Sequence, residues 1–310
     1  MSRVEIVEVG PRDGFQPVGP FIPTEVKLNY VARLAAAGLH RIEIGSFVSE
    51  KAVPQLADTP ELLFLSRDIP GLRPQVLVPS LGRGIKAFEA GAPELAFVIS
   101  ASPSHSQANV RRTPLEASAE YLQLLDRMPK DVRIRLNIAT AFDCPFDGRV
   151  SAGTVRTLLD PLVAARSDVE IALCDTTGRA DPAQVTSLFG DLMARFPQNV
   201  VWAFHGHDTF GLGLANAYAT WTQGVRVFDA AFAGLGGCPF APGATGNIAT
   251  EDLVNMFHSM GVDTEVDTVA LQGIAEDGCR IPGALIGGRV RDAIAAHRQL
   301  DLTRGGEPNG

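Results

Sequence analysis

The sequence is poor in cysteine and lacks the paired cysteines that mark disulfide frameworks and zinc knuckles. It has four cysteines in 310 residues, and no two of them form a C-x-x-C motif. Widely spaced cysteines are typical of reduced thiols in an intracellular protein. We therefore predict a cytoplasmic location and no structural zinc site.

The chain also lacks long apolar segments and basic runs. No stretch approaches the roughly 18 apolar residues that a membrane helix requires, and no apolar signal segment is visible at the start. The formal net charge is −8, from 27 Lys and Arg against 35 Asp and Glu. We expect neither a membrane nor a nucleic acid as partner. An anionic substrate must instead be held by a local cluster of cations or by a metal ion.

Nucleotide-binding motifs are missing as well, although strands and helices alternate along the chain. The first predicted strand runs into Gly10-Pro11-Arg12-Asp13-Gly14, which is not a G-x-G-x-x-G fingerprint, and no P-loop occurs. Apolar runs predict eight strands, over residues 4–9, 41–44, 75–78, 95–99, 132–138, 170–173, 200–204 and 227–231. Helical patterns lie between and after them, over residues 24–37, 60–66, 84–90, 115–126, 152–165, 182–195, 212–223 and 250–260. Eight such units in about 250 residues favour an α/β fold of the closed (β/α)8 TIM-barrel type over an open doubly wound sheet.

The last part of the chain continues this pattern without another strand. Residues 263–302 contain two further helical patterns, and residues 304–310 have the composition of a disordered tail. No linker or change of composition interrupts the chain. We predict one TIM-barrel domain over residues 1–303, including additional C-terminal helices.

Polar side chains follow the first, seventh and eighth predicted strands, which are neighbours in a closed barrel. Asp13 follows the first strand, His205 and His207 follow the seventh, and Asn247 follows the eighth. Catalytic groups of such barrels lie after the strands, and two residues at i and i+2 of an extended segment point the same way. An H-x-H pair alone can be two hydrogen-bonded structural histidines. The added carboxylate and amide favour a divalent-metal site.

Charged residues near these strand ends have both structural and functional interpretations. Arg12 is either an ion-pair partner at the surface or a group that stabilises negative charge on an oxygen beside a metal. Glu8 and Glu43 lie within strands, where a buried carboxylate needs a partner such as Arg12 or the metal site. Asp175 follows the sixth strand and either orients a catalytic group or starts a helix.

The remaining cysteines and histidines also have alternatives. Cys238 lies in a Gly-rich loop, residues 234–246, and is either an acid or nucleophile beside a cationic centre or a small filler of a turn. We predict structural roles for the other residues of these two types, which are Cys144, Cys174, Cys279, His40, His105, His258 and His297.

Six motifs, in the same order, resemble those of the 3-hydroxy-3-methylglutaryl-CoA lyase family. They are V-E-V-G-P-R-D-G, I-E-x-x-S-F-V, C-P-F-D-G, C-D-T-T-G, H-G-H-D-T-F-G-x-x-x-A-N and G-L-G-G-C-P-F-A-x-G-A-x-G-N-x-A-T-E-D-L. The resemblance covers about residues 3–300. The last motif contains the signature cysteine of the family, whereas isopropylmalate and homocitrate synthases look different at this loop and carry a long C-terminal domain.

The resemblance implies roles for particular residues. Mg²⁺ or Mn²⁺ binds to Asp13, His205, His207 and Asn247. The catalytic residues are Arg12, Asp13, His205, Glu43 and Cys238, of which Arg12 stabilises an enolate and Cys238 takes part in proton transfer. The substrate-binding positions are Arg12, Glu8, Ser46, Asn109, Arg135, Asp175 and Thr176. Barrels of this family are often homodimers.

The reaction implied by the resemblance is retro-Claisen cleavage of 3-hydroxy-3-methylglutaryl-CoA to acetyl-CoA and acetoacetate, a step of leucine degradation. A base, His205 or Asp13, takes the proton of the substrate hydroxyl. Arg12 stabilises the enolate oxygen, and Cys238 protonates the enolate carbon.

The sequence departs from the family pattern at positions where the acyl group could be contacted. These positions are Phe15, residues 17–21, Pro103, Asp143 and Ala172. Because one methylene is discriminated by only about 1–3 kcal/mol, a related 3-hydroxyacyl-CoA such as citramalyl-CoA stays an alternative substrate. A condensing acyl-CoA synthase of the same superfamily is a further alternative. The Cys238 loop and the lack of a long C-terminal domain argue against it.

Overall fold

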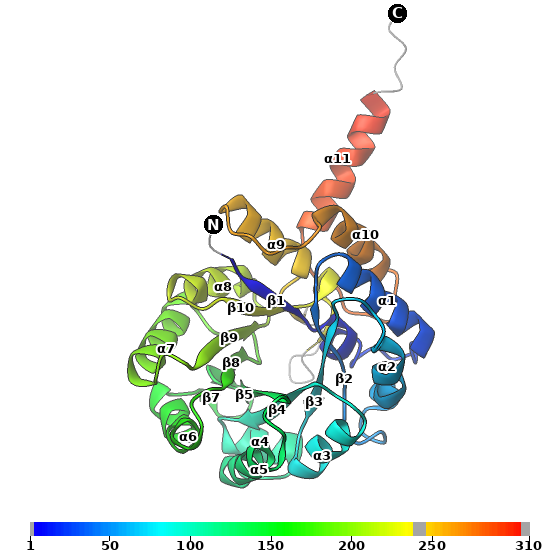
Figure 1. The fold of residues 1–310 in the computed structure, drawn as a ribbon. Helices are drawn as coiled ribbons and strands as arrows, with labels where there is room; N and C mark the ends of the chain where they lie inside the picture. The colour runs from blue at the N-terminus through cyan, green and yellow to red at the C-terminus, as the bar shows by residue number, and fades with distance from the viewer. Residues whose placement is uncertain (1–2, 238–245, 305–310) are drawn as a thin grey trace, which may run out of the picture.

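The computed structural model describes residues 3–237 and 246–304 as a closed barrel of eight parallel strands (Figure 1). Around the barrel the strands follow the order β1-β10-β9-β8-β5-β4-β3-β2. Their bounds are β1 (Glu5–Glu8), β2 (Arg41–Ser46), β3 (Arg73–Val78), β4 (Glu94–Ser100), β5 (Arg133–Ala139), β8 (Glu170–Asp175), β9 (Val201–Gly206) and β10 (Val227–Ala230). The predicted TIM barrel is therefore confirmed.

Helices form a ring around the strands. Their bounds are α1 (Thr24–Ala36), α2 (Thr59–Ser66), α3 (Leu81–Glu89), α4 (Pro103–Val110), α5 (Pro114–Arg127), α6 (Ala152–Ala165), α7 (Pro182–Arg195), α8 (Gly213–Thr222), α9 (Thr250–Ser259), α10 (Thr268–Gly278) and α11 (Val290–Arg304). In Figure 1, α11 projects away from the barrel beyond α9 and α10. Within the described residues, no helix has both the length and the apolar character needed to cross a membrane.

Local sequence signals explain where several helices begin. Thr113 and Glu116 form a reciprocal capping box at the start of α5, which satisfies two backbone N–H groups that have no partner within the helix. Ser151 caps α6 and Asp181 caps α7 through side-chain oxygens. These caps fix the residue at which each of the three helices begins.

The strands are buried on both faces, as expected for a parallel sheet that is covered by helices. One hydrophobic cluster extends from Val4 to Ala275 and joins the barrel interior to the inner faces of the helices. Burial of both faces explains why the strands appear in the sequence as nearly continuous apolar runs.

Five features were missed by the sequence analysis. Helix α4 follows β4, an antiparallel hairpin β6–β7 (Asp143–Cys144 and Gly148–Arg149) follows β5, and a π-helical turn η1 (Gly10–Gly14) follows β1. Two short 3₁₀ turns, η2 (Pro54–Leu56) and η3 (Phe232–Gly234), follow β2 and β10. All five lie in loops at the carboxyl ends of strands. The C-terminal helices α10 and α11 agree with the two helical patterns expected there.

Candidate active site

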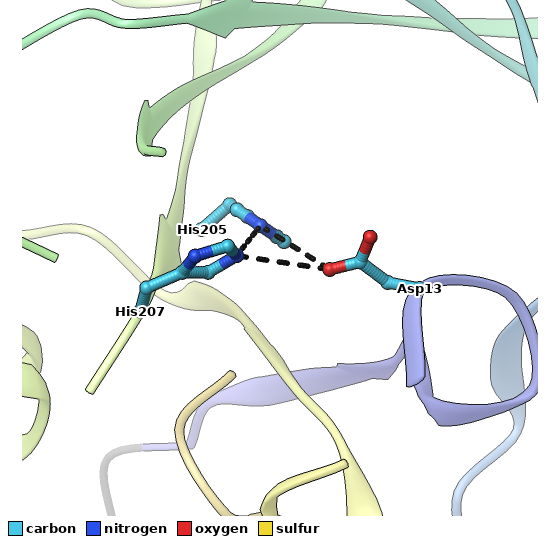
Figure 2. Close-up of side chains that lie close together, drawn as sticks. All are labelled: Asp13, His205 and His207. Atoms are coloured by element: carbon cyan, nitrogen blue, oxygen red, sulfur yellow. Dashed lines mark hydrogen bonds and ion pairs between the residues drawn. The ribbon is translucent and has the colours of Figure 1, made fainter. Parts of the chain in front are cut away.

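Three predicted metal ligands converge at the carboxyl end of the barrel (Figure 2). Asp13 lies in the turn η1, and His205 and His207 lie at and just after the end of β9. The Nε2 atoms of the two histidines are 3.2 Å apart, and Asp13 Oδ2 lies 3.9 Å from His205 Nε2 and 3.7 Å from His207 Nε2. The three groups face one another because β1, β10 and β9 are consecutive in the barrel.

Asn247 lies beside these three residues. It pairs with His207 in an isolated antiparallel bridge, and its Nδ2 donates to Asp13 Oδ2 at 2.8 Å and to the Leu235 carbonyl at 3.0 Å. Its Oδ1 is buried and has no hydrogen-bond partner among the described residues. A buried amide oxygen without a donor is costly, so this atom is suited to receive a ligand.

The chemistry of the four side chains fits a divalent cation. A carboxylate and two imidazoles together are a ligand set that suits Mg²⁺, Mn²⁺, Fe²⁺ or Zn²⁺, and no thiolate of a described cysteine joins the group. The buried Oδ1 of Asn247, which lacks a partner, could supply a further oxygen ligand. The residues present therefore fit a divalent metal ion.

Arg12 connects the metal-ligand group to a buried carboxylate. Its Nε donates to Glu43 Oε2 at 2.6 Å, and its Nη1 donates to Asp13 Oδ1. Burial alone raises the pKa of Asp13, but Arg12, followed by the two histidines, holds that pKa well below its usual range. Burial lowers the pKa of His207, so this imidazole is neutral near pH 7. Asp13 is thus ionised and His207 uncharged, as metal binding requires.

A cavity of about 890 Å³ opens beside this group. Six of the predicted site residues line it, namely Arg12, Asp13, Asn109, Thr176, His205 and His207. Four cations, Lys51, Arg83, Arg111 and Arg112, also line the cavity. Although the whole chain is acidic, this cavity therefore presents a local cationic surface.

Six other predicted residues do not line the cavity within the part of the chain that the structure describes: Glu8, Glu43, Ser46, Arg135, Asp175 and Asn247. Ser46 donates through Oγ to the Leu77 carbonyl at 3.1 Å. The carboxylate of Asp175 accepts from the Ala180 N–H, and burial raises its pKa to about 7. It holds the loop after β8, whereas α7 is capped by Asp181. Cys238 lies outside the described residues.

Two residues predicted to be structural do line the cavity. Cys174 lies in β8, next to His205 of β9 in the sheet register. His105 begins α4, and its Nδ1 lies 2.7 Å from Ser100 Oγ. Cys174 could have been identified from the sequence, because it directly follows a predicted strand. His105 was missed because α4 was not predicted, although Ser102-Pro103 is a sequence signal for a helix start.

Comparison with known proteins gives the family. A family model described as HMGL-like matches residues 3–277. The (R)-citramalyl-CoA lyase of Chloroflexus aurantiacus is 40% identical over 87% of this chain and 88% of that protein. The 3-hydroxy-3-isohexenylglutaryl-CoA/hydroxy-methylglutaryl-CoA lyase of Pseudomonas aeruginosa is 37% identical over 95% of this chain and 98% of that protein.

Solved structures of HMG-CoA lyases are also similar to this chain. An HMG-CoA lyase from Acinetobacter baumannii, solved in complex with coenzyme A and 3-methylmalate, superposes with a TM-score of 0.87 at 37% identity and covers 94% of this chain and 95% of that chain. The family predicted from the motifs is confirmed by sequence and by structure: the chain belongs to the HMGL-like family.

Proposed function

We propose that this protein is a divalent-metal-dependent carbon–carbon lyase that cleaves 3-hydroxy-3-methylglutaryl-CoA to acetyl-CoA and acetoacetate. The observation that carries the proposal is the convergence of Asp13, His205 and His207 beside Arg12 at the carboxyl end of the barrel. The family and two relatives named as lyases of 3-hydroxyacyl-CoA esters support it.

The cationic residues that line the cavity support an acyl-CoA substrate. Coenzyme A carries several phosphate groups, and Lys51, Arg83, Arg111 and Arg112 line the cavity that also contains the metal-ligand group. Arginine and lysine are the side chains that hold phosphates in proteins. We assign the four cations to the phosphate end of the substrate and the metal-ligand group to its acyl end.

The reaction requires removal of a hydroxyl proton and stabilisation of an enolate. A divalent ion held by Asp13, His205, His207 and Asn247 would polarise the substrate hydroxyl and lower its pKa. Arg12 is held by Glu43 and Asp13 on two sides, which fixes its guanidinium for the enolate oxygen of the departing thioester. The fixed orientation matters because a charge placed before the reaction needs no reorganisation during it.

The proton transfers involve two further groups. His205 and Asp13 are the candidate bases. Both are also proposed metal ligands, so each can take the proton only through an atom that does not hold the ion, and Arg12 and the histidines hold the pKa of Asp13 low. Cys238, in the signature motif, is our candidate for protonating the enolate carbon to form acetyl-CoA. We also propose Mg²⁺ or Mn²⁺ as the ion, a homodimer as the assembly, and the cytoplasm as the location.

A second substrate is supported by one specific observation, namely the 40% identity to a citramalyl-CoA lyase. Citramalyl-CoA has one fewer methylene, and its cleavage by the same chemistry gives acetyl-CoA and pyruvate. The ratio of kcat/KM for the two substrates decides between them, because a pocket discriminates over one methylene by about 10–200-fold at most.

The test compares three reactions of the purified protein with Mn²⁺. We expect acetyl-CoA from 3-hydroxy-3-methylglutaryl-CoA, with less from citramalyl-CoA, and loss of both activities on addition of a chelator. The Asp13→Asn variant should lose activity, whereas Asp208→Asn, a neighbour of His207 whose carboxylate accepts from the Gly213 N–H, should keep it. Release of free CoA from acetyl-CoA and a 2-oxoacid would instead identify a condensing synthase, and failure to cleave either ester would refute the lyase.

A further inference from the structure

His205 is held from inside the barrel by a carboxylate that is itself held by an arginine. Nδ1 of His205 lies 3.0 Å from Asp229 Oδ2, and both oxygens of Asp229 accept from Arg135 Nη2 at 2.8 Å. All three side chains are buried. We propose that Asp229 and Arg135 are positioning residues that fix the tautomer and the orientation of His205 for metal binding.

The barrel register places Asp229 in this role. Asp229 lies in β10 directly opposite His205 of β9, so the two side chains leave neighbouring strands toward the same interior. Asp229 is 3% exposed, and its side-chain hydrogen-bond partners within the described residues are His205 and Arg135. A buried carboxylate accepts hydrogen bonds and does not donate them. When the ring carries a single proton, as metal binding requires, that proton therefore belongs on Nδ1, which leaves the Nε2 lone pair directed at His207 and Asp13.

Arg135 fixes the carboxylate in turn. Its Nε donates to Asn137 Oδ1 at 2.9 Å and lies 3.4 Å from Glu170 Oε1. Held on that side, the guanidinium presents Nη2 to both oxygens of Asp229 and prevents the carboxylate from rotating away from His205. Arg135 was predicted from the resemblance to bind substrate. It is 1% exposed and does not line the cavity within the described residues, so a positioning role accounts for its place in the structure.

The two histidines of the site differ in this respect. His207 Nδ1 is buried and has no hydrogen-bond partner among the described residues, so no carboxylate orients this ring from behind. His205 Nε2, which lies 3.2 Å from His207 Nε2, is the ring nitrogen whose lone pair Asp229 pre-organises. Carboxylates that orient a ligating histidine in this way typically contribute about 10–100-fold to metal affinity.

The inference rests on the proposed metal site, but its first test needs no metal and no substrate. Histidine ¹⁵N NMR of the metal-free protein distinguishes Nδ1–H from Nε2–H tautomers, and the His205→Asn variant assigns the His205 signals. We expect Nδ1–H for His205 in the wild type. An Nε2–H tautomer would overturn the proposal, whatever the protein proves to catalyse.

The second test measures Mn²⁺ affinity by calorimetry and thermal stability in parallel. Asp229→Asn should weaken Mn²⁺ binding by about 10–100-fold, because the amide places an N–H where the carboxylate accepts. Arg135→Lys keeps a positive charge but loses the fixed guanidinium, so its affinity should lie between those of the wild type and Asp229→Asn. It also serves as the test if Asp229→Asn does not fold.

Glu94→Gln is the matched control. Glu94 is a buried carboxylate inside the same barrel that pairs with Arg41 and accepts from Gln75, so its replacement is expected to reduce stability without changing Mn²⁺ affinity. Wild-type affinity in Asp229→Asn, or an equal loss in Glu94→Gln, would show that Asp229 acts on stability alone. Absence of Mn²⁺ binding by the wild type would contradict the proposed function, while the NMR result would still decide the position of the His205 proton.

Discussion

At the scale of single residues, Glu8 shows how a carboxyl group is accommodated in the barrel wall. It is fully buried. Its Oε1 accepts from the N–H groups of Gly10 and Phe232, and its Oε2 lies 2.7 Å from Thr250 Oγ1. Burial raises the pKa of Glu8 to about 8. The threonine hydroxyl donates to Oε2 of the carboxylate. In the neutral acid this bond is reversed, with Oε2–H donating to the hydroxyl, and Oε1 still accepts from the two N–H groups, so Glu8 can join three chain segments around the site without carrying a charge.

This arrangement predicts that Glu8→Gln is tolerated and flattens the pH dependence of stability. The folded-state pKa of about 8 is above the ordinary value of 4.5, so the stability contributed by Glu8 is fully present below the ordinary pKa and is lost as the pH rises through 8. Urea unfolding at about pH 6 and about pH 9 should show a smaller loss for the variant than for the wild type. Glu251, whose pKa burial raises to about 7, adds a loss of the same sign to both proteins. Equal losses would show that Glu8 is ionised in the fold.

A second residue-scale prediction concerns Arg12, which separates two carboxylates. In Arg12→Gln, Glu43 loses its cation while remaining 1% exposed, and the enolate oxygen loses its proposed partner. We expect kcat to fall by about 10²–10³-fold and the melting temperature to fall as well, since an unpaired buried charge is strongly destabilising. Arg12→Lys should restore much of the stability but little of the activity, because a lysine cannot hold both carboxylates in a fixed geometry. Near-normal kcat in Arg12→Gln would remove Arg12 from the mechanism.

At the scale of elements, the turn between α1 and β2 joins the barrel to the C-terminal helices. Gly38 has φ +97°, and a Cβ at this position would overlap the carbonyl oxygen of Glu265. The neighbouring Ala37 carbonyl accepts from the Asp267 N–H, just before α10. The close approach of the two backbones therefore requires glycine.

We predict that Gly38→Ala destabilises the protein by about 1–3 kcal/mol more than Gly91→Ala does. Gly91 follows α3 with φ +88° and has no atom within 4 Å of the Cβ position, so it measures the cost of the left-handed backbone alone, about 1 kcal/mol. Free energies of unfolding from urea titration give both values. Equal costs would mean that the segment around Glu265 moves freely to accept a methyl group.

Sequence patterns predict the barrel strands better than the short elements in the loops between them. Continuous apolar runs gave all eight barrel strands, because a strand buried on both faces has little choice of side chain. Asp13, His205 and His207 were found because their position after a strand is visible in the sequence. Asp229 was not, since nothing in Val227–Ala230 indicates which neighbour a buried carboxylate meets. The turn η1 and helix α4 were missed because short irregular elements depend on tertiary contacts more than on periodicity.

At the scale of the whole molecule, buried charges close the end of the barrel opposite the site. Arg41 of β2 donates to Glu170 of β8 at 2.9 Å and to Glu5 of β1 at 3.1 Å, and it also pairs with Glu94 of β4. These strands lie on different sides of the barrel. Arg41 and Glu94 are each 3% exposed as side chains. One guanidinium thus links four strands, of which β8 lies across the ring from β2 whereas β1 is its direct neighbour.

The stability of the whole barrel should therefore depend on Arg41. Arg41→Met leaves Glu94 buried without a cation, so we expect a loss of about 3–5 kcal/mol, seen as a lower melting temperature in a single cooperative transition. Glu94→Leu alone leaves Arg41 with two other carboxylates and should cost less. If the two residues act as a pair, the double variant Arg41→Met/Glu94→Leu loses less free energy of unfolding than the sum of the two single losses, by at least about 1 kcal/mol. The reason is that apolar side chains can replace a buried ion pair. Strict additivity would mean that Arg41 stabilises the barrel mainly through Glu170 and Glu5, and the same cycle with Glu170→Leu would then show the coupling.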